Sequence, residues 1–171
     1  MFTSIAIIGR PNVGKSTLFN KLTKTREAIV SDFPGLTKDR NYGYIKLGSI
    51  KSFIIDTGGI GKDESNLSQN ISEQAWMAAN ECNLILFLVD GSENLTSEDF
   101  DILSSLRKLN KPFITLLNKS DKSSKSEALN DISSKGIKDY LDISAEHSRG
   151  LDDLKKLLIK MLPEKTDETV P

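Results

Sequence analysis

The sequence predicts an α/β protein of three layers, in which helices cover both faces of a mostly parallel sheet with one antiparallel edge strand. Three observations predict this class. Short apolar runs without polar alternation recur along the chain, as in strands buried on both faces. Stretches with helical spacing of apolar residues separate these runs. A glycine-rich motif typical of phosphate-binding loops follows the first run.

The apolar runs give the expected strands, which are residues 5–8, 53–55, 84–89, 113–117 and 140–143. Residues 42–47 and 51–55 flank Gly48-Ser49, so they predict a hairpin whose outer strand is the antiparallel edge.

Helices are expected between the strands. Residues 17–22 predict one helix, and two sets of apolar residues at helical spacing predict two more: Ile71, Ala75, Ala78 and Cys82, and Leu151, Leu154, Leu158 and Met161. Two further helices are expected to start at capping boxes, Thr96 with Asp99 and Ser124 with Glu127. Glu98, Asp99 and Asp101 are expected to be a solvated helix start, and Asp90 has no predicted role.

Length and composition predict one domain, residues 1–162, followed by the start of a linker, residues 163–171. The net charge of −1 excludes a strongly basic nucleic-acid binder, so no DNA partner is expected, and any RNA contact needs local patches or other parts of a longer protein. No apolar run approaches the about 20 residues of a membrane span, and no signal peptide or membrane partner is expected. The single cysteine, Cys82, predicts a core thiol.

Residues 9–16 match G-x-x-x-x-G-K-[ST] between a predicted strand and a predicted helix, which is the context that this motif requires. Backbone N–H groups and the helix N-terminus would hold a triphosphate, Lys15 would reach the β- and γ-phosphates, and Ser16 would bind Mg²⁺. The predicted nucleotide contacts here are Gly9, Arg10, Pro11, Asn12, Val13, Gly14, Lys15, Ser16 and Thr17. The motif predicts that the fold is that of the P-loop NTPases.

Asn118-Lys119-Ser120-Asp121 follows a buried strand, where open α/β sheets bind ligands. The Asp121 carboxylate can accept both N–H groups of the guanine edge, whereas N1 of adenine presents a lone pair. Asn118 would brace neighbouring loops, and the stem of Lys119 would pack along the base. The pattern therefore predicts GTP rather than ATP.

Ser144, Ala145 and Glu146 follow the last predicted strand, and the Ala145 N–H is expected to face O6 of guanine. The same short sequence occurs in ordinary strand-to-helix turns, so this assignment depends on the stronger motifs.

Asp56-Thr57-Gly58-Gly59 follows another strand, where the carboxylate would hold Mg²⁺ through a water and the Gly59 N–H would sense the γ-phosphate. Thr37, in a long loop, would complete the Mg²⁺ shell and contact the γ-phosphate unless it is a plain loop residue. Loss of that phosphate would release both loops. The expected catalytic residues are Lys15, Thr37 and Gly59, and the expected Mg²⁺ residues are Ser16, Thr37 and Asp56. The predicted nucleotide contacts in this segment are Asp56, Thr57, Gly58, Gly59 and Ile60.

Ile60 stands where Ras-like GTPases carry the Gln that orients the attacking water. Asn12 is the candidate to compensate, because its side-chain oxygen can hold K⁺ against the phosphates; the alternative is that Asn12 merely shapes the loop. We expect slow intrinsic hydrolysis that K⁺ stimulates more than Na⁺. His147 is not expected to be catalytic, and the sequence leaves Trp76 open between packing and partner contact.

Residues 9–20, 34–40, 56–59, 118–121 and 144–147 together resemble the TrmE–Era–EngA–YihA branch of translation-factor GTPases. Asp-Thr-Gly-Gly at 56–59 narrows the resemblance to the first G domain of the Der (EngA) family, over residues 3–162. Lys38 and Ser148 depart from the family pattern, where Arg and Gly are common. The departure at Lys38 puts a bidentate partner contact in doubt.

The resemblance implies the small G-domain form of the P-loop NTPase fold. It also implies a cytoplasmic bacterial GTPase that binds GTP, GDP and Mg²⁺ and acts in assembly of the large ribosomal subunit. Two alternatives stay open. One is a nucleotide-gated docking module with little turnover, which Ile60 favours. The other is the G domain of a K⁺-dependent tRNA-modification GTPase that dimerises across its switches, against which Asp56-Thr57-Gly58-Gly59 argues.

Overall fold

The computed structural model describes residues 3–23, 41–59, 71–119 and 125–163. The strands are β1 (Thr3–Ile8), β2 (Tyr42–Leu47), β3 (Ile50–Asp56), β4 (Leu84–Asp90), β5 (Phe113–Asn118) and β6 (Tyr140–Asp142). The helices are α1 (Lys15–Leu22), α3 (Glu73–Glu81), α4 (Ser97–Leu109), α5 (Lys125–Ser134) and α6 (Leu151–Met161), with a 3₁₀ turn, η1, at Thr57–Gly59. Residues 164–171, most of the predicted linker start, and Ser124, half of a predicted capping box, lie outside the described residues.

The six strands form one sheet in the order β2-β3-β1-β4-β5-β6, and β2 is antiparallel to β3 while the other described pairs are parallel. The predicted hairpin and antiparallel edge strand are therefore confirmed. Since β1 lies between β3 and β4, the carboxyl end of β1 is a topological switch point, where open α/β sheets bind ligands. Strands β3, β4 and β5 end at this edge in residues with polar side chains, which are Asp56, Asp90 and Asn118.

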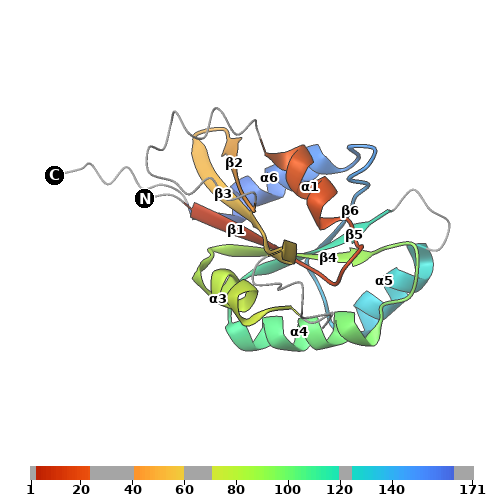
Figure 1. The fold of residues 1–171 in the computed structure, drawn as a ribbon. Helices are drawn as coiled ribbons and strands as arrows, with labels where there is room; N and C mark the ends of the chain where they lie inside the picture. The colour runs from red at the N-terminus through yellow and green to blue at the C-terminus, as the bar shows by residue number, and fades with distance from the viewer. Residues whose placement is uncertain (1–2, 24–40, 60–70, 120–124, 164–171) are drawn as a thin grey trace.

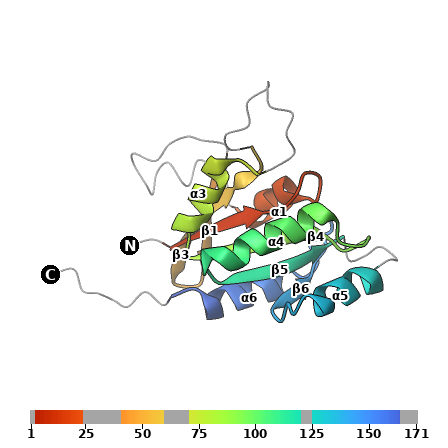
Figure 2. The same ribbon diagram turned by 90° about the horizontal axis from the view of Figure 1, so that it is seen from below.

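Helices cover both faces of the sheet, as predicted (Figures 1 and 2). One hydrophobic core joins α1 and α6 to the sheet face that includes Ile5, Ile7 and Ile54. The second core joins α3, α4 and α5 to the opposite face, which includes Phe87. Inner strand β4 is buried along its whole length, which explains its unbroken apolar run.

The start of α4 has the predicted capping box, whereas the inner face of α3 differs from the expectation in one residue. Thr96 and Asp99 form the predicted capping box at the start of α4. In α3, however, Ala79 rather than Ala78 is fully buried together with Ala75, because the helix turns that face toward the core around Phe87. Trp76 is half-buried against the same core, and Cys82 is buried, as a core thiol should be.

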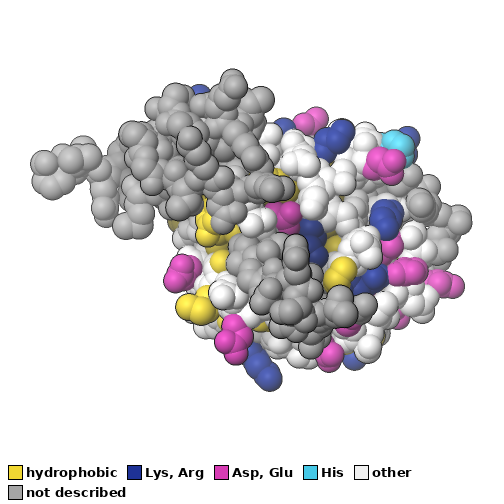
Figure 3. Space-filling view, viewed as in Figure 1, with side chains coloured by type: hydrophobic (Ala, Val, Ile, Leu, Met, Phe, Trp, Pro, Cys, Tyr) yellow, Lys and Arg dark blue, Asp and Glu magenta, His cyan; other side chains and the backbone are white. Residues whose placement is uncertain are grey.

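Charges of both signs are interspersed on the molecular face in Figure 3, in keeping with the near-neutral net charge. Among the described residues, no helix is long and apolar enough to cross a lipid bilayer.

Candidate nucleotide-binding site

The phosphate loop connects β1 to α1 and relies on backbone that only certain residues adopt. Gly14 is the N-cap of α1 with φ of 105°, a left-handed value that disfavours side chains. A Cβ on Gly14 would lie 2.3 Å from Asn118 Nδ2, and one on Gly9 would lie 2.6 Å from the Leu88 carbonyl oxygen. Asn12 also has positive φ, 68°, a conformation in which Asn is enriched. The loop is thus folded tightly against the ends of β4 and β5.

Lys15 is buried, and its Nζ lies inside the loop. It donates to the carbonyl oxygens of Gly9 at 2.6 Å and Arg10 at 2.9 Å. A Cβ on Gly58 would lie 2.8 Å from Lys15 Cε, so the absence of a side chain at Gly58 leaves room for the lysine. The ammonium group is therefore held where the loop and η1 meet, as a residue that receives phosphate oxygens requires.

Ser16 and Asp56, the two described residues that are predicted to bind Mg²⁺, lie within hydrogen-bond distance of each other. The Ser16 hydroxyl donates to Asp56 Oδ2 at 3.3 Å, while Asp56 Oδ1 accepts the Gly58 N–H at 3.0 Å. A carboxylate oxygen from β3 and a hydroxyl oxygen from α1 thus converge beside the phosphate loop. This hard oxygen donor set fits Mg²⁺, which binds through few carboxylates, hydroxyls and substrate phosphates.

Asn118 joins the phosphate loop to the predicted guanine loop. Its Nδ2 donates to the Val13 carbonyl oxygen at 2.8 Å, and its Oδ1 accepts the Ala145 N–H at 2.9 Å. Both bonds are buried, and they link positions 105 and 27 residues away in the chain. The bracing role predicted for Asn118 is seen in these contacts. The Ala145 N–H, expected to face guanine O6, is instead donated to Asn118, so a bond to the base would require it to be shared.

Lys119 connects two other elements of the site. Its Nζ lies 3.0 Å from Asp90 Oδ2 and donates to the Asn12 carbonyl oxygen at 3.3 Å. Burial alone would raise the pKa of Asp90, but hydrogen bonds from the Ser92 hydroxyl and N–H and the nearby Lys119 hold it below its ordinary value. Asp90 is therefore charged at neutral pH and fixes Lys119. The sequence contains a signal that could have placed Asp90 at the site, because Asp90 ends a buried strand just as Asn118 does.

Arg10 ties the phosphate loop to α4. Its guanidinium lies 2.5 Å from Glu93 Oε1 and 3.3 Å from Asp99 Oδ2. The Asp99 oxygen also accepts the Thr96 N–H and hydroxyl of the capping box. Asp99 is 1% exposed, so the expectation of a solvated carboxylate is wrong. Packing of α4 against the phosphate loop, 89 residues away in sequence, buries it.

Replacing Arg10 with alanine is expected to lower the melting temperature, because a buried carboxylate loses its cation. The loss of a partner from a buried charge costs about 3–5 kcal/mol, and we expect about half of it here since Thr96 still donates to Asp99. Thermal unfolding checks this. Arg149→Ala, at an exposed arginine, is the matched control. Equal melting temperatures for the two variants would contradict a stabilising ion pair between Arg10 and Asp99.

Two predicted contact residues use their side chains elsewhere. The Thr57 hydroxyl is buried and donates to the Ile7 carbonyl oxygen at 2.7 Å, which anchors η1 to β1. Val13 is buried in a hydrophobic core, so only its backbone is available to a ligand. Their assignment as nucleotide contacts therefore holds at most for their main chains. Thr37, Ile60 and Asp121 lie outside the described residues, and their predicted roles stay predictions.

Known proteins are similar to this chain in sequence and in fold. The family model described as 50S ribosome-binding GTPase matches residues 4–119. GTPase Der from Legionella pneumophila (strain Corby) is 46% identical over 168 residues, which are 98% of this chain and 36% of that protein. The chain thus spans little more than a third of the curated relatives it matches.

Solved structures agree on the fold. Aquifex aeolicus Era bound to GDP·AlF₄⁻ matches with a TM-score of 0.74 and 33% identity, over 96% of this chain and 58% of that one. Era in complex with MgGDPNP and nucleotides 1506–1542 of 16S ribosomal RNA matches with a TM-score of 0.75 and 33% identity, over 95% of this chain and 57% of that one. The predicted P-loop GTPase fold is confirmed. The chain belongs to the 50S ribosome-binding GTPase family, within which it matches the first G domain of GTPase Der.

Proposed function

We propose that this domain binds and hydrolyses GTP and acts as a switch in assembly of the large ribosomal subunit in the bacterial cytoplasm. The observation that carries the proposal is Asn118, which joins the phosphate loop to the 144–145 loop through two buried hydrogen bonds. These bonds hold the loop that we propose for the triphosphate next to the loop that we propose for the base. The family description and the Der relatives supply the ribosomal partner.

The residues divide the work as follows. Lys15, held by the Gly9 and Arg10 carbonyl groups, turns to the β- and γ-phosphates and offsets the charge of the transferring phosphoryl group. Ser16 and Asp56 hold Mg²⁺, which supplies charge neutralisation of the phosphates when bound; the Era complex with MgGDPNP supports this cofactor. Asp121 selects guanine, and Thr37 and Gly59 sense the γ-phosphate.

Asn12 is proposed to hold K⁺ beside the phosphates, because Ile60 cannot orient the attacking water. Asn12 is exposed at the tip of the phosphate loop, and its main-chain oxygen already accepts from Lys119. The backbone of Asn12 is therefore anchored by Lys119, while its side chain is exposed and free to bind a cation.

Steady-state GTP hydrolysis is expected to be several-fold faster in KCl than in NaCl at equal ionic strength. Unstimulated turnover should stay within about 10⁻⁴–10⁻² s⁻¹, as for GTPases without an activating partner. Asn12→Ala should abolish the difference between the two salts. Equal rates of the unaltered chain in KCl and NaCl would contradict the proposal that Asn12 binds K⁺. The proposal that the domain binds GTP would not be affected.

A docking module with little turnover is the second candidate, which Ile60 favours since it removes the usual water-orienting side chain. Single-turnover hydrolysis with and without ribosomal subunits separates the two. Acceleration by large subunits supports the GTPase switch. Stable docking of the GTP-bound chain on large subunits, with hydrolysis unchanged, supports the docking module.

A further inference from the structure

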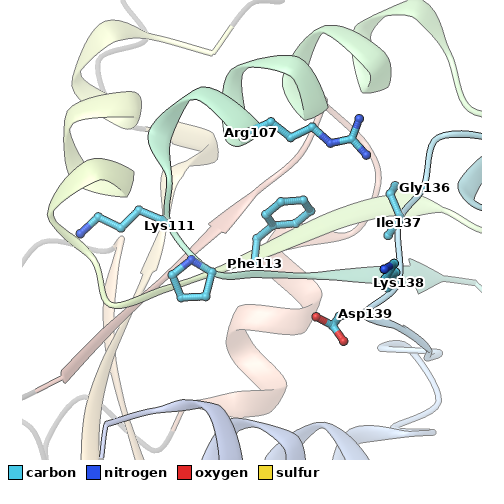
Figure 4. A pocket seen from close by; sticks show the side chains of 8 residues that line it. Arg107, Lys111, Phe113, Gly136, Ile137, Lys138 and Asp139 are labelled. Carbon is cyan, nitrogen blue, oxygen red and sulfur yellow. The ribbon is translucent and has the colours of Figure 1, made fainter.

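A second pocket lies at the sheet edge opposite the nucleotide site. It is a cavity of about 340 Å³ between the end of α4, the start of β5 and the 136–139 segment that leads into β6 (Figure 4). Since the phosphate and guanine motifs follow the carboxyl ends of the strands, a pocket at the amino ends of β5 and β6 can be filled while GTP or GDP is bound.

Positive charge predominates around this pocket. Arg107, Lys111 and Lys138 line it, against one carboxylate, Asp139. The ion pairs found among the described residues involve Arg10 and Lys119, so none of them neutralises these three cations. Arg107 donates from its guanidinium to the Lys135 carbonyl oxygen, which fixes it across the cavity. The pocket therefore attracts an anion.

The other residues that line the pocket are mostly apolar, and one of them is aromatic. Pro112, Phe113 and Ile137 contribute to the wall, and the half-buried Phe113 ring lies among the labelled side chains in Figure 4, below Arg107. Lys111 and Lys138 lie on opposite sides of Phe113 in Figure 4, and the Lys111 side chain extends away from the ring. Lys135 adds a further cation nearby, with its Nζ 4.7 Å from the centre of the Phe100 ring. An aromatic ring between cations suits a ligand that carries both a phosphate and a planar base.

We propose that this pocket binds one nucleotide unit of single-stranded RNA, with Lys111 and Lys138 on backbone phosphates and Phe113 against the base. The choice of RNA as the source of the nucleotide rests on the proposed ribosomal function. The volume is at the lower end of the range for small-molecule pockets, which fits a single nucleotide. A net charge of −1 for the chain confines such contacts to a local patch of this kind.

The test is fluorescence anisotropy of a labelled uridine octamer, with excess GDP and Mg²⁺ to fill the phosphate loop. Lys111→Glu with Lys138→Glu is expected to weaken binding at least tenfold and to reduce the salt dependence by a slope of about 1.4, for two lost phosphate contacts. Phe113→Leu, which keeps an apolar side chain, should weaken binding about fivefold or more through lost stacking. Lys46→Glu with Lys156→Glu, at two exposed lysines on β2 and α6, is the control with the same charge change.

Selective loss in the pocket variants supports the site. Equal loss in the control pair would show general charge attraction and overturn it, as would equal binding of an octaglutamate peptide. Displacement of the octamer by UMP at equal affinity would assign the pocket to a free nucleotide and overturn the RNA source. GDP affinity measured on the same proteins keeps the two proposals apart: failure to bind GDP refutes the proposed function, whereas the octamer measurements decide the pocket.

Discussion

Lys15→Ala is expected to lower the rate of GTP hydrolysis by about 10²–10³-fold, the usual effect of removing one donor to charge that develops in the transition state. The loss is large because Lys15 is buried and its Nζ is already positioned by the Gly9 and Arg10 carbonyl oxygens. Single-turnover hydrolysis at saturating GTP measures it.

Lys21→Ala is the matched control for Lys15, since Lys21 is an exposed lysine in the last turn of the same helix, α1. Its rate should stay within about twofold of the unaltered chain, because surface substitutions away from special features have small effects. If Lys15→Ala keeps more than a tenth of the original rate, the phosphate contact assigned to Lys15 is wrong.

Asn118→Ala is expected to reduce both stability and nucleotide affinity. It removes two buried hydrogen bonds and leaves the Val13 carbonyl and the Ala145 N–H without that partner, which together cost about 3 kcal/mol. For a domain of this size the loss corresponds to a fall in melting temperature of roughly 6–12 °C. Since both loops carry predicted nucleotide contacts, GDP affinity should fall as well.

Calorimetric unfolding and GDP titration check the Asn118 prediction. Asn130→Ala, at an exposed position on α5, is the control and should change neither quantity appreciably. A melting temperature for Asn118→Ala that equals the control would show that the two loops hold together without the Asn118 side chain.

The strands and the phosphate loop could be predicted from the sequence because each is encoded by neighbouring residues. Apolar runs give the strands, and the spacing of Gly9, Gly14 and Lys15 needs no distant partner. The sheet edge that gathers Asp56 and Asn118 also follows, since carboxyl ends of parallel strands meet at one edge.

Features that depend on distant neighbours were missed. Asp99 has the pattern of a solvated helix start, and only the approach of Arg10 reveals a buried ion pair. The Thr57 hydroxyl donates a hydrogen bond to the carbonyl oxygen of Ile7, 50 residues earlier, and no local sequence pattern predicts this bond. Ala79 rather than Ala78 is buried because the sheet, not the helix alone, decides which face of α3 turns inward.

The most direct measurement is the dissociation constant for GDP, ADP and XDP, by calorimetry in Mg²⁺, on the unaltered chain and on Asp121→Asn. The proposed guanine site predicts that GDP binds more tightly than ADP by on the order of 10⁴-fold, because a site built to hydrogen-bond one ligand rejects an analogue that leaves its polar groups unpaired. It also predicts that Asp121→Asn prefers XDP to GDP. ADP binding within tenfold of GDP, or an unchanged preference in Asp121→Asn, would contradict the assignment of this domain as a GTP switch.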